Sequence, residues 1–203
     1  MMIERKLYDG ISKIAWGYFL LYCNINIAIG GITVNILPSF AGFLLFLSAI
    51  GLLCEEEREL SLLRIPCIVL AVWNGVQWGL DMFGVQTNEV LRIVDFICVL
   101  LNLYFHFQLL TNMAGIAEKY QPEDVFLNRK LLQCRTAQTV ALTVIFVLTR
   151  FQPWLGEVWA YISVIILIAY LAVCFYMMHI LFRLRKCIRV PQTDEQGEND
   201  ETV

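Results

Sequence analysis

Six apolar segments, separated by short polar connections, constrain the fold of this 203-residue chain more than any other feature. An α-helix of about 20 apolar residues crosses the ~30 Å hydrocarbon core of a bilayer. Hydrophobic residues make up 59% of the chain and charged residues only 16%, which excludes an ordinary soluble domain. We therefore expect an all-α, polytopic transmembrane helix bundle that forms one domain over residues 1–190. The six expected spans are approximately residues 11–29, 36–54, 65–83, 90–110, 136–151 and 158–182.

The basic residues are distributed unequally between the two sides that these spans define. Arg92 and Arg150 fall on one side. The other thirteen of the fifteen Lys and Arg residues share the opposite side: Arg5, Lys6, Lys13, Arg58, Arg64, Lys119, Arg129, Lys130, Arg135, Arg183, Arg185, Lys186 and Arg189. Because short cytoplasmic loops carry an excess of Lys and Arg, this distribution predicts that both termini are cytoplasmic. The expected location is the cell membrane, as a multi-pass protein.

Three polar stretches on the predicted cytoplasmic side lie outside the expected spans. Residues 191–203 are acidic and lack aromatic residues, which predicts a disordered tail. Residues 118–135 mix Leu and Phe with charges, which indicates a short amphipathic segment on the inner membrane surface. The acidic run at residues 55–59 is expected to extend the second span into solvent, or to contact a basic partner or the basic end of the sixth span. That basic end consists of Arg183, Arg185, Lys186 and Arg189.

The first span and the connection after it carry an unusual set of residues. The pair Trp16-Gly17 is followed by Asn24 and Asn26, and then by Ile-Leu-Pro-Ser-Phe-Ala-Gly at residues 36–42. This pattern resembles an uncharacterised family of small polytopic membrane proteins from gut Firmicutes. The resemblance covers about residues 16–63. It implies a bacterial plasma-membrane protein and supplies no activity that could be carried over.

The connection between the first two spans is expected to break the helix. Gly30 and Gly31 terminate a helix readily, and Pro38 suits the first turn of the next one. Two structures are compatible with this pattern: a plain hairpin turn at the outer surface, and a partly re-entrant loop whose backbone lines a cavity. Lipid-exposed irregular backbone is excluded, because its polar groups would have no partners.

Polar residues form a stripe on each of the third and fourth spans, which are antiparallel neighbours. At helical spacing, these stripes contain Asn74, Gln77 and Asp81 on the third span and Arg92, Asp95, Asn102 and His106 on the fourth. One interpretation is structural: the carboxylates pair with Arg92, and the amides hydrogen-bond across the helix interface. The other is a hydrophilic path through a small transporter or channel, with Asp95 as the cation or proton site.

The two histidines, His106 and His179, are expected at similar depths near the cytoplasmic ends of the fourth and sixth spans. Their imidazoles could together bind a b-type haem or a metal ion. No His-x-x-x-His or Glu-x-x-His spacing accompanies them, so two interfacial side chains are the plainer interpretation. We therefore expect neither a cofactor nor a metal, and we keep a site at His106 and His179 as an alternative.

The sequence contains no motif for hydrolysis, for nucleotide binding or for nucleic-acid binding. We therefore expect that the chain is not an enzyme. Its expected function is that of a membrane scaffold or interaction subunit, in contact with the lipid bilayer and with other membrane proteins or further copies of itself. A small transporter or channel, and a haem- or metal-binding membrane protein, are the two alternatives.

Overall fold

The computed structural model describes residues 2–22, 26–29, 32–35, 38–84, 88–122, 125–156 and 158–188. These residues form α-helices, one 3-10 helix and one two-stranded antiparallel hairpin: α1 (Met2–Tyr22), β1 (Asn26–Ile29), β2 (Ile32–Asn35), α2 (Ser39–Leu53), η1 (Arg58–Leu63), α3 (Arg64–Met82), α4 (Glu89–Tyr120), α5 (Leu127–Leu155) and α6 (Val158–Cys187). The expected helical class is confirmed, with the short hairpin as an addition. The expected tail, residues 191–203, lies outside the described residues.

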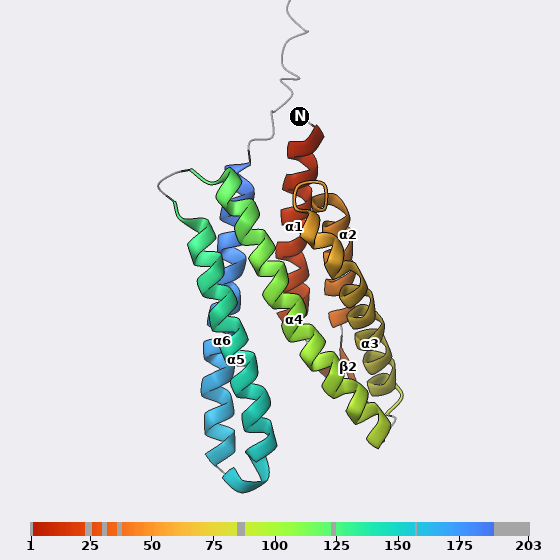
Figure 1. The fold of residues 1–203 in the computed structure, drawn as a ribbon. Coiled ribbons are helices and arrows are strands. Elements are labelled where there is room, and N and C mark those ends of the chain that lie inside the picture. Colours follow the sequence, from red (N-terminus) through yellow and green to blue (C-terminus); the bar gives the residue numbers. More distant parts are fainter. Residues whose placement is uncertain are drawn as a thin grey trace, which may run out of the picture.

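The helices form two arms that α4 connects (Figure 1). One arm contains α1, α2 and α3, which pack in sequence order, and the other contains α5 packed against α6. The long helix α4 begins beside the end of α3 and then packs along α5, while α1 closes the arrangement by packing against α6. The start of α1 and the end of α6 lie at the same end of the molecule, and the arms separate toward the opposite end.

Four helical segments are long and apolar enough to cross a membrane: Arg58–Met82, Glu89–Tyr120, Leu127–Thr149 and Tyr161–Cys187. Helix α2 is also apolar but has only 15 residues, or about 22 Å of helix. Helix α1 has 21 residues, and its first half contains several charged residues. By length and composition, the structure therefore supports four of the six expected spans.

The structure contradicts the expectation that the first span is one helix through Ile29. Helix α1 ends at Tyr22, and strands β1 and β2 follow with Asn26 opposite Asn35 and Ile29 opposite Ile32. β-Branched Ile, Thr and Val favour extended backbone, and the two residues between the strands are both glycine in the sequence. The helix break was expected, whereas the strands on both sides of it were not.

The expectation of a separate amphipathic segment over residues 118–135 is also wrong. Helix α4 continues to Tyr120, and α5 begins at Leu127 rather than near residue 136. The polar residues at the start of α5 are accommodated by neighbouring helices: Arg135 lies over the ring of Phe107, 4.3 Å from its centroid, and Gln138 is buried. Contacts of this kind let polar residues continue a helix that hydropathy alone would end.

A close approach of α1 and α2 organises the core. A Cβ added at Gly42 would lie 2.8 Å from the carbonyl oxygen of Gly17, so the two backbones touch where side chains would normally separate them. Next to this contact, the rings of Tyr18 and Phe46 pack edge to face with their centroids 4.9 Å apart. Both side chains are fully buried. The two glycines therefore set the spacing at which the aromatic core forms.

We expect the substitution Gly42→Ala to lower the free energy of unfolding by about 1–3 kcal/mol, because the new methyl group meets a backbone oxygen that has no room to move. Gly51→Ala, on the same helix, is the matched control. A Cβ at Gly51 meets nothing within 4 Å, so this variant should keep or slightly raise the stability. Heat-dependent labelling of the buried thiol of Cys67 measures both variants. Equal unfolding midpoints for the two would contradict the close approach.

Candidate functional site

The stripes of α3 and α4 meet at one point. Asp95 Oδ1 accepts hydrogen bonds from Trp73 Nε1 at 3.2 Å and from Gln77 Nε2 at 3.4 Å. The two stripes therefore touch at Gln77 and Asp95, and the indole of Trp73 is an additional donor that the sequence analysis did not include. These bonds connect α3 to α4 and use the carboxylate that had been considered as a transport site.

Asn74 and Arg92, two other members of the stripes, bind elsewhere. Asn74 accepts from Ser39 Oγ at 2.9 Å and donates to the carbonyl oxygen of Leu70 at 2.8 Å, which directs it toward α2. Arg92 forms its ion pair with Glu89, at 3.1 Å on the same helix, and not with Asp81 or Asp95 as expected. Asp81 is exposed at the end of α3. The stripe thus divides into local contacts rather than forming a continuous polar path.

His106 points into the core rather than toward the stripe of α3. Its Nδ1 lies 3.2 Å from the hydroxyl of Tyr18 on α1, and its ring packs among Phe43, Phe46 and Phe105. Only 3% of the residue is exposed. The polar contact of His106 therefore comes from α1, through a tyrosine that the sequence analysis did not single out.

Further polar side chains connect the contact between Tyr18 and His106 to the arm that contains α5 and α6. The ring of Tyr22, at the end of α1, stacks on that of Tyr18 and meets that of Tyr170 on α6 edge to face, with centroids 5.5 Å apart. Gln138 on α5 donates through Nε2 to the hydroxyl of Tyr22. Tyr170 also lies within hydrogen-bonding reach of Cys174. We call Tyr18, Tyr22, His106, Gln138, Tyr170 and Cys174 the junction cluster, because they link helices α1, α4, α5 and α6.

The junction cluster contains unused hydrogen-bonding capacity. Gln138 is 2% exposed, and its Oε1 has no hydrogen-bond partner among the described residues. Asn102, one turn before His106 on α4, likewise has a buried Oδ1 without a partner in the described part of the chain. Buried acceptors of this kind bind water or the donor of another molecule when either is present. A pattern of tyrosine at helical spacing was the available sequence signal, and it does not distinguish this cluster from ordinary aromatic packing.

The two histidines have different surroundings. His179 on α6 is exposed, whereas His106 is buried. Within the described ranges, no group of three or more His, Cys, Asp or Glu side chains could hold a metal ion. The contacts of His106 are with aromatic rings and a phenol, which are not usual metal ligands. Nothing in its described surroundings adds a ligand to the alternative pair of His106 and His179.

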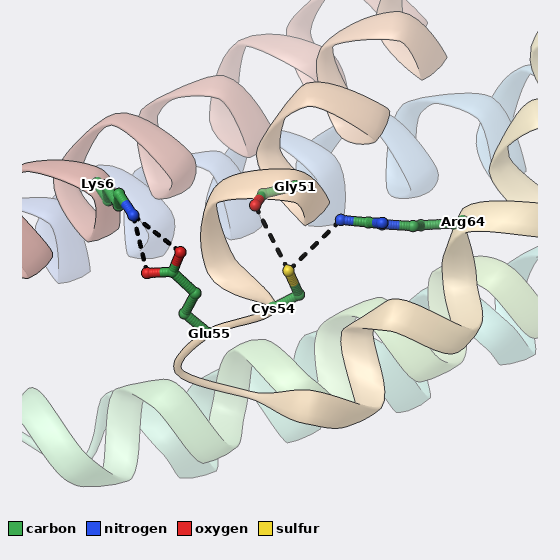
Figure 2. Close-up of polar contacts among 5 residues, drawn as sticks. All are labelled: Lys6, Gly51, Cys54, Glu55 and Arg64. Atoms are coloured by element: carbon green, nitrogen blue, oxygen red, sulfur yellow. Dashed lines mark hydrogen bonds and ion pairs between the residues drawn. The ribbon is translucent and has the colours of Figure 1, made fainter.

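The acidic run at residues 55–59 forms ion pairs with α1 and α4. Glu55 pairs with Lys6 of α1 at 2.8 Å, and Lys119 of α4 lies 3.2 Å from Glu56 and 3.5 Å from Glu57. Figure 2 shows Glu55 directed toward Lys6. The run is a turn followed by η1, so it is not a continued helix, and its ion-pair partners within the described residues are Lys6 and Lys119 rather than the basic end of α6.

Beside these ion pairs lies the thiol of Cys54 (Figure 2). Its Sγ accepts from Arg64 Nη2 at 3.5 Å and donates to the carbonyl oxygen of Gly51 at 3.4 Å. The guanidinium of Arg64 thus connects the end of α2 to the start of α3. The thiol and guanidinium stabilise the turn together with Glu55 and Lys6.

Comparison of the chain with protein-family models, with curated proteins and with solved structures finds no match. The resemblance to the gut Firmicutes family therefore remains a prediction from residues 16–63.

We expect Tyr18→Phe to lower the free energy of unfolding by about 1 kcal/mol, because the substitution removes the buried partner of His106 Nδ1 without changing the ring. Tyr161→Phe is the control, since 74% of Tyr161 is exposed. Thermal unfolding of both variants in the same detergent gives the comparison. An unchanged midpoint for Tyr18→Phe would show that this contact contributes nothing to stability.

Proposed function

We propose that this chain is an integral membrane protein of a bacterial plasma membrane that crosses the bilayer six times, with both termini in the cytoplasm. The segregation of charge supports this orientation, since Lys6 lies near the start of α1, and Lys119 and Arg185 lie in the last turns of α4 and α6. Arg92 lies at the opposite end of α4. The outer connections after α3 and α5 are short, as they are in a bundle of antiparallel spans.

The first two crossings would be built from a helix and the hairpin together. From Lys13 to Tyr22, α1 supplies about 15 Å, and four extended residues add about 13 Å. Strand β2 and the 15 residues of α2 supply a similar length in the opposite direction. The hairpin packs against α3, which agrees with the rule that non-helical backbone inside a membrane is covered by protein or lines a cavity.

Within the membrane, we assign the chain a non-enzymatic role as an interaction or scaffold subunit for other membrane proteins or for further copies of itself. The observation that carries this proposal is the use of the polar side chains. Asp95, Asn74 and His106, which a conducting path would need to expose, bind other helices of the same chain. Polar side chains used in this way fix the positions of helices, and a fixed bundle is what a subunit presents to its partners.

A transporter or channel is the second candidate, and one observation favours it. The acceptors Gln138 Oε1 on α5 and Asn102 Oδ1 on α4 are buried without partners among the described residues. Transporters commonly bind substrate near the bilayer midplane, where two groups of helices meet. The third hypothesis, haem or metal bound by His106 and His179, has no such contact in its favour, and a Soret band in purified protein would support it.

We predict that reporters fused to the two termini of the chain give the same topology. A fluorescent protein that folds only in the cytoplasm should be bright at both ends, because six crossings return the chain to its starting side. A phosphatase that is active only outside the cytoplasm should be active when inserted at Gln86 and inactive at either terminus. Opposite results at the two termini would contradict an even number of crossings.

The interaction role and the transport role predict different results for the purified protein in proteoliposomes. As a subunit, the wild-type protein should give ion and proton flux at the level of empty liposomes, while capture from native membranes should recover defined protein partners or further copies of the chain. As a transporter, it should give flux that Asp95→Asn abolishes and Asp81→Asn does not, because Asp81 lies outside the contact between α3 and α4. Flux with that dependence would overturn the subunit proposal.

A further inference from the structure

The charges at the cytoplasmic end of the molecule are unevenly divided between the two arms. Residues 125–135, which include the start of α5, and residues 177–188, at the end of α6, contain no Asp or Glu. They contain six basic residues, which we call the α5/α6 basic end: Arg129, Lys130, Arg135, Arg183, Arg185 and Lys186. The packing of α5 against α6 brings the two groups to one side of the molecule (Figure 1).

Three acidic residues of the same molecular end have basic partners on α1 and α4. Glu55, Glu56 and Glu57 pair with Lys6 and Lys119. Within the part of the chain that the structure describes, none of the six residues of the α5/α6 basic end takes part in an ion pair. The positive charge of α5 and α6 is therefore not neutralised by the described carboxylates.

Two of these residues are held in place by neutral groups. Arg135 donates from Nη1 to Thr111 Oγ1 at 3.0 Å while its guanidinium lies over Phe107. Arg185 donates from Nη1 to Ser12 Oγ at 3.1 Å, and its guanidinium lies 5.1 Å from the ring centroid of Tyr8. Hydroxyl groups and rings orient a guanidinium without cancelling its charge. Each guanidinium has five N–H donors, and one hydrogen bond leaves several of them unused.

The α5/α6 basic end lies at the depth of phospholipid headgroups, if the chain crosses the membrane as proposed above. A crossing of ~30 Å takes about 20 helical residues. Counted from the ends of α5 and α6 that adjoin Gly156, this length ends near Arg135 on α5 and Met178 on α6. The other five basic residues then lie within about 12 Å of the hydrocarbon boundary.

We propose that the α5/α6 basic end is a binding site for the phosphate of an anionic phospholipid, and that the opposite arm has no equivalent site. The phosphate oxygens accept from guanidinium and ammonium donors, with Arg135 and Arg185 preset by their contacts to α4 and α1. Basic residues that project between helices at the cytoplasmic surface bind anionic headgroups in this way. The inference rests on the proposed membrane location and is independent of the subunit role.

The test uses the full chain in vesicles of phosphatidylcholine with a minor fraction of phosphatidylglycerol. After solubilisation, mass spectrometry measures the ratio of phosphatidylglycerol to phosphatidylcholine retained by the purified protein. This ratio is compared with the ratio in the vesicles. The wild type should be enriched in phosphatidylglycerol, and Arg183→Gln combined with Lys186→Gln should lower the enrichment by about tenfold. The matched control is Arg5→Gln combined with Arg58→Gln, which removes two exposed cations from the acid-rich arm and should leave the enrichment unchanged.

Equal enrichment in both double variants, or none in the wild type, would overturn the proposal. The proposal would also be overturned if the wild type showed no enrichment while a form truncated after Ile188 did. The acidic tail, rather than a lipid, would then occupy the α5/α6 basic end of the full chain. If the α5/α6 variant does not fold, raising the salt concentration with the wild type replaces it, and an enrichment that resists salt overturns the proposal. Resistance of the protein to alkaline extraction is measured in parallel, so a failed lipid site is distinguished from a failed membrane location.

Discussion

The contact between Gly17 and Gly42 is the interaction on which the rest of the interior depends. It brings the backbones of α1 and α2 together closely enough for Tyr18 and Phe46 to pack around the imidazole of His106. In the membrane location proposed above, lipid would provide no hydrophobic force that drives helices together, so close packing and buried hydrogen bonds would have to hold them. The hydrogen bond between Tyr18 and His106 and the aromatic ring contacts both follow from that spacing.

Much of the fold could be predicted from hydropathy and charge. The helices of residues 64–82 and 158–187 agree with the expected spans because each is a long apolar run between clear polar ends. The hairpin at residues 26–35 could not be predicted in the same way. Its Ile, Val and Ala residues are as apolar as those of a span, and a hydropathy window does not distinguish extended from helical backbone. The polar residues near the start of α5 have tertiary partners, such as Phe107 under Arg135, which the sequence does not show.

The candidate site likewise contains contacts that the sequence could indicate and contacts that it could not. Spacing predicted only that polar stripes lie on the two connected antiparallel helices, and the contact between Gln77 and Asp95 is one that such stripes allow. Spacing could not predict the neighbour of His106. Helix α4 meets α3 near its start and α5 further along, and its periodicity does not tell which neighbour each turn contacts. Tyr18 lies 88 residues from its histidine partner, so no local pattern connects them. The ion pairs of residues 55–57 likewise required the approach of α1 and α4.

The length of α4 has a mechanical consequence. Its 32 residues form one uninterrupted helix about 48 Å long, without proline, and it belongs to both arms. A proline-free helix has no ready point at which to kink, so the arms cannot change their relative angle by folding at its middle. Any such movement must swing α4 as a stiff lever. A small displacement where Lys119 meets the acidic turn would then appear as a larger one where α4 begins, about 45 Å away.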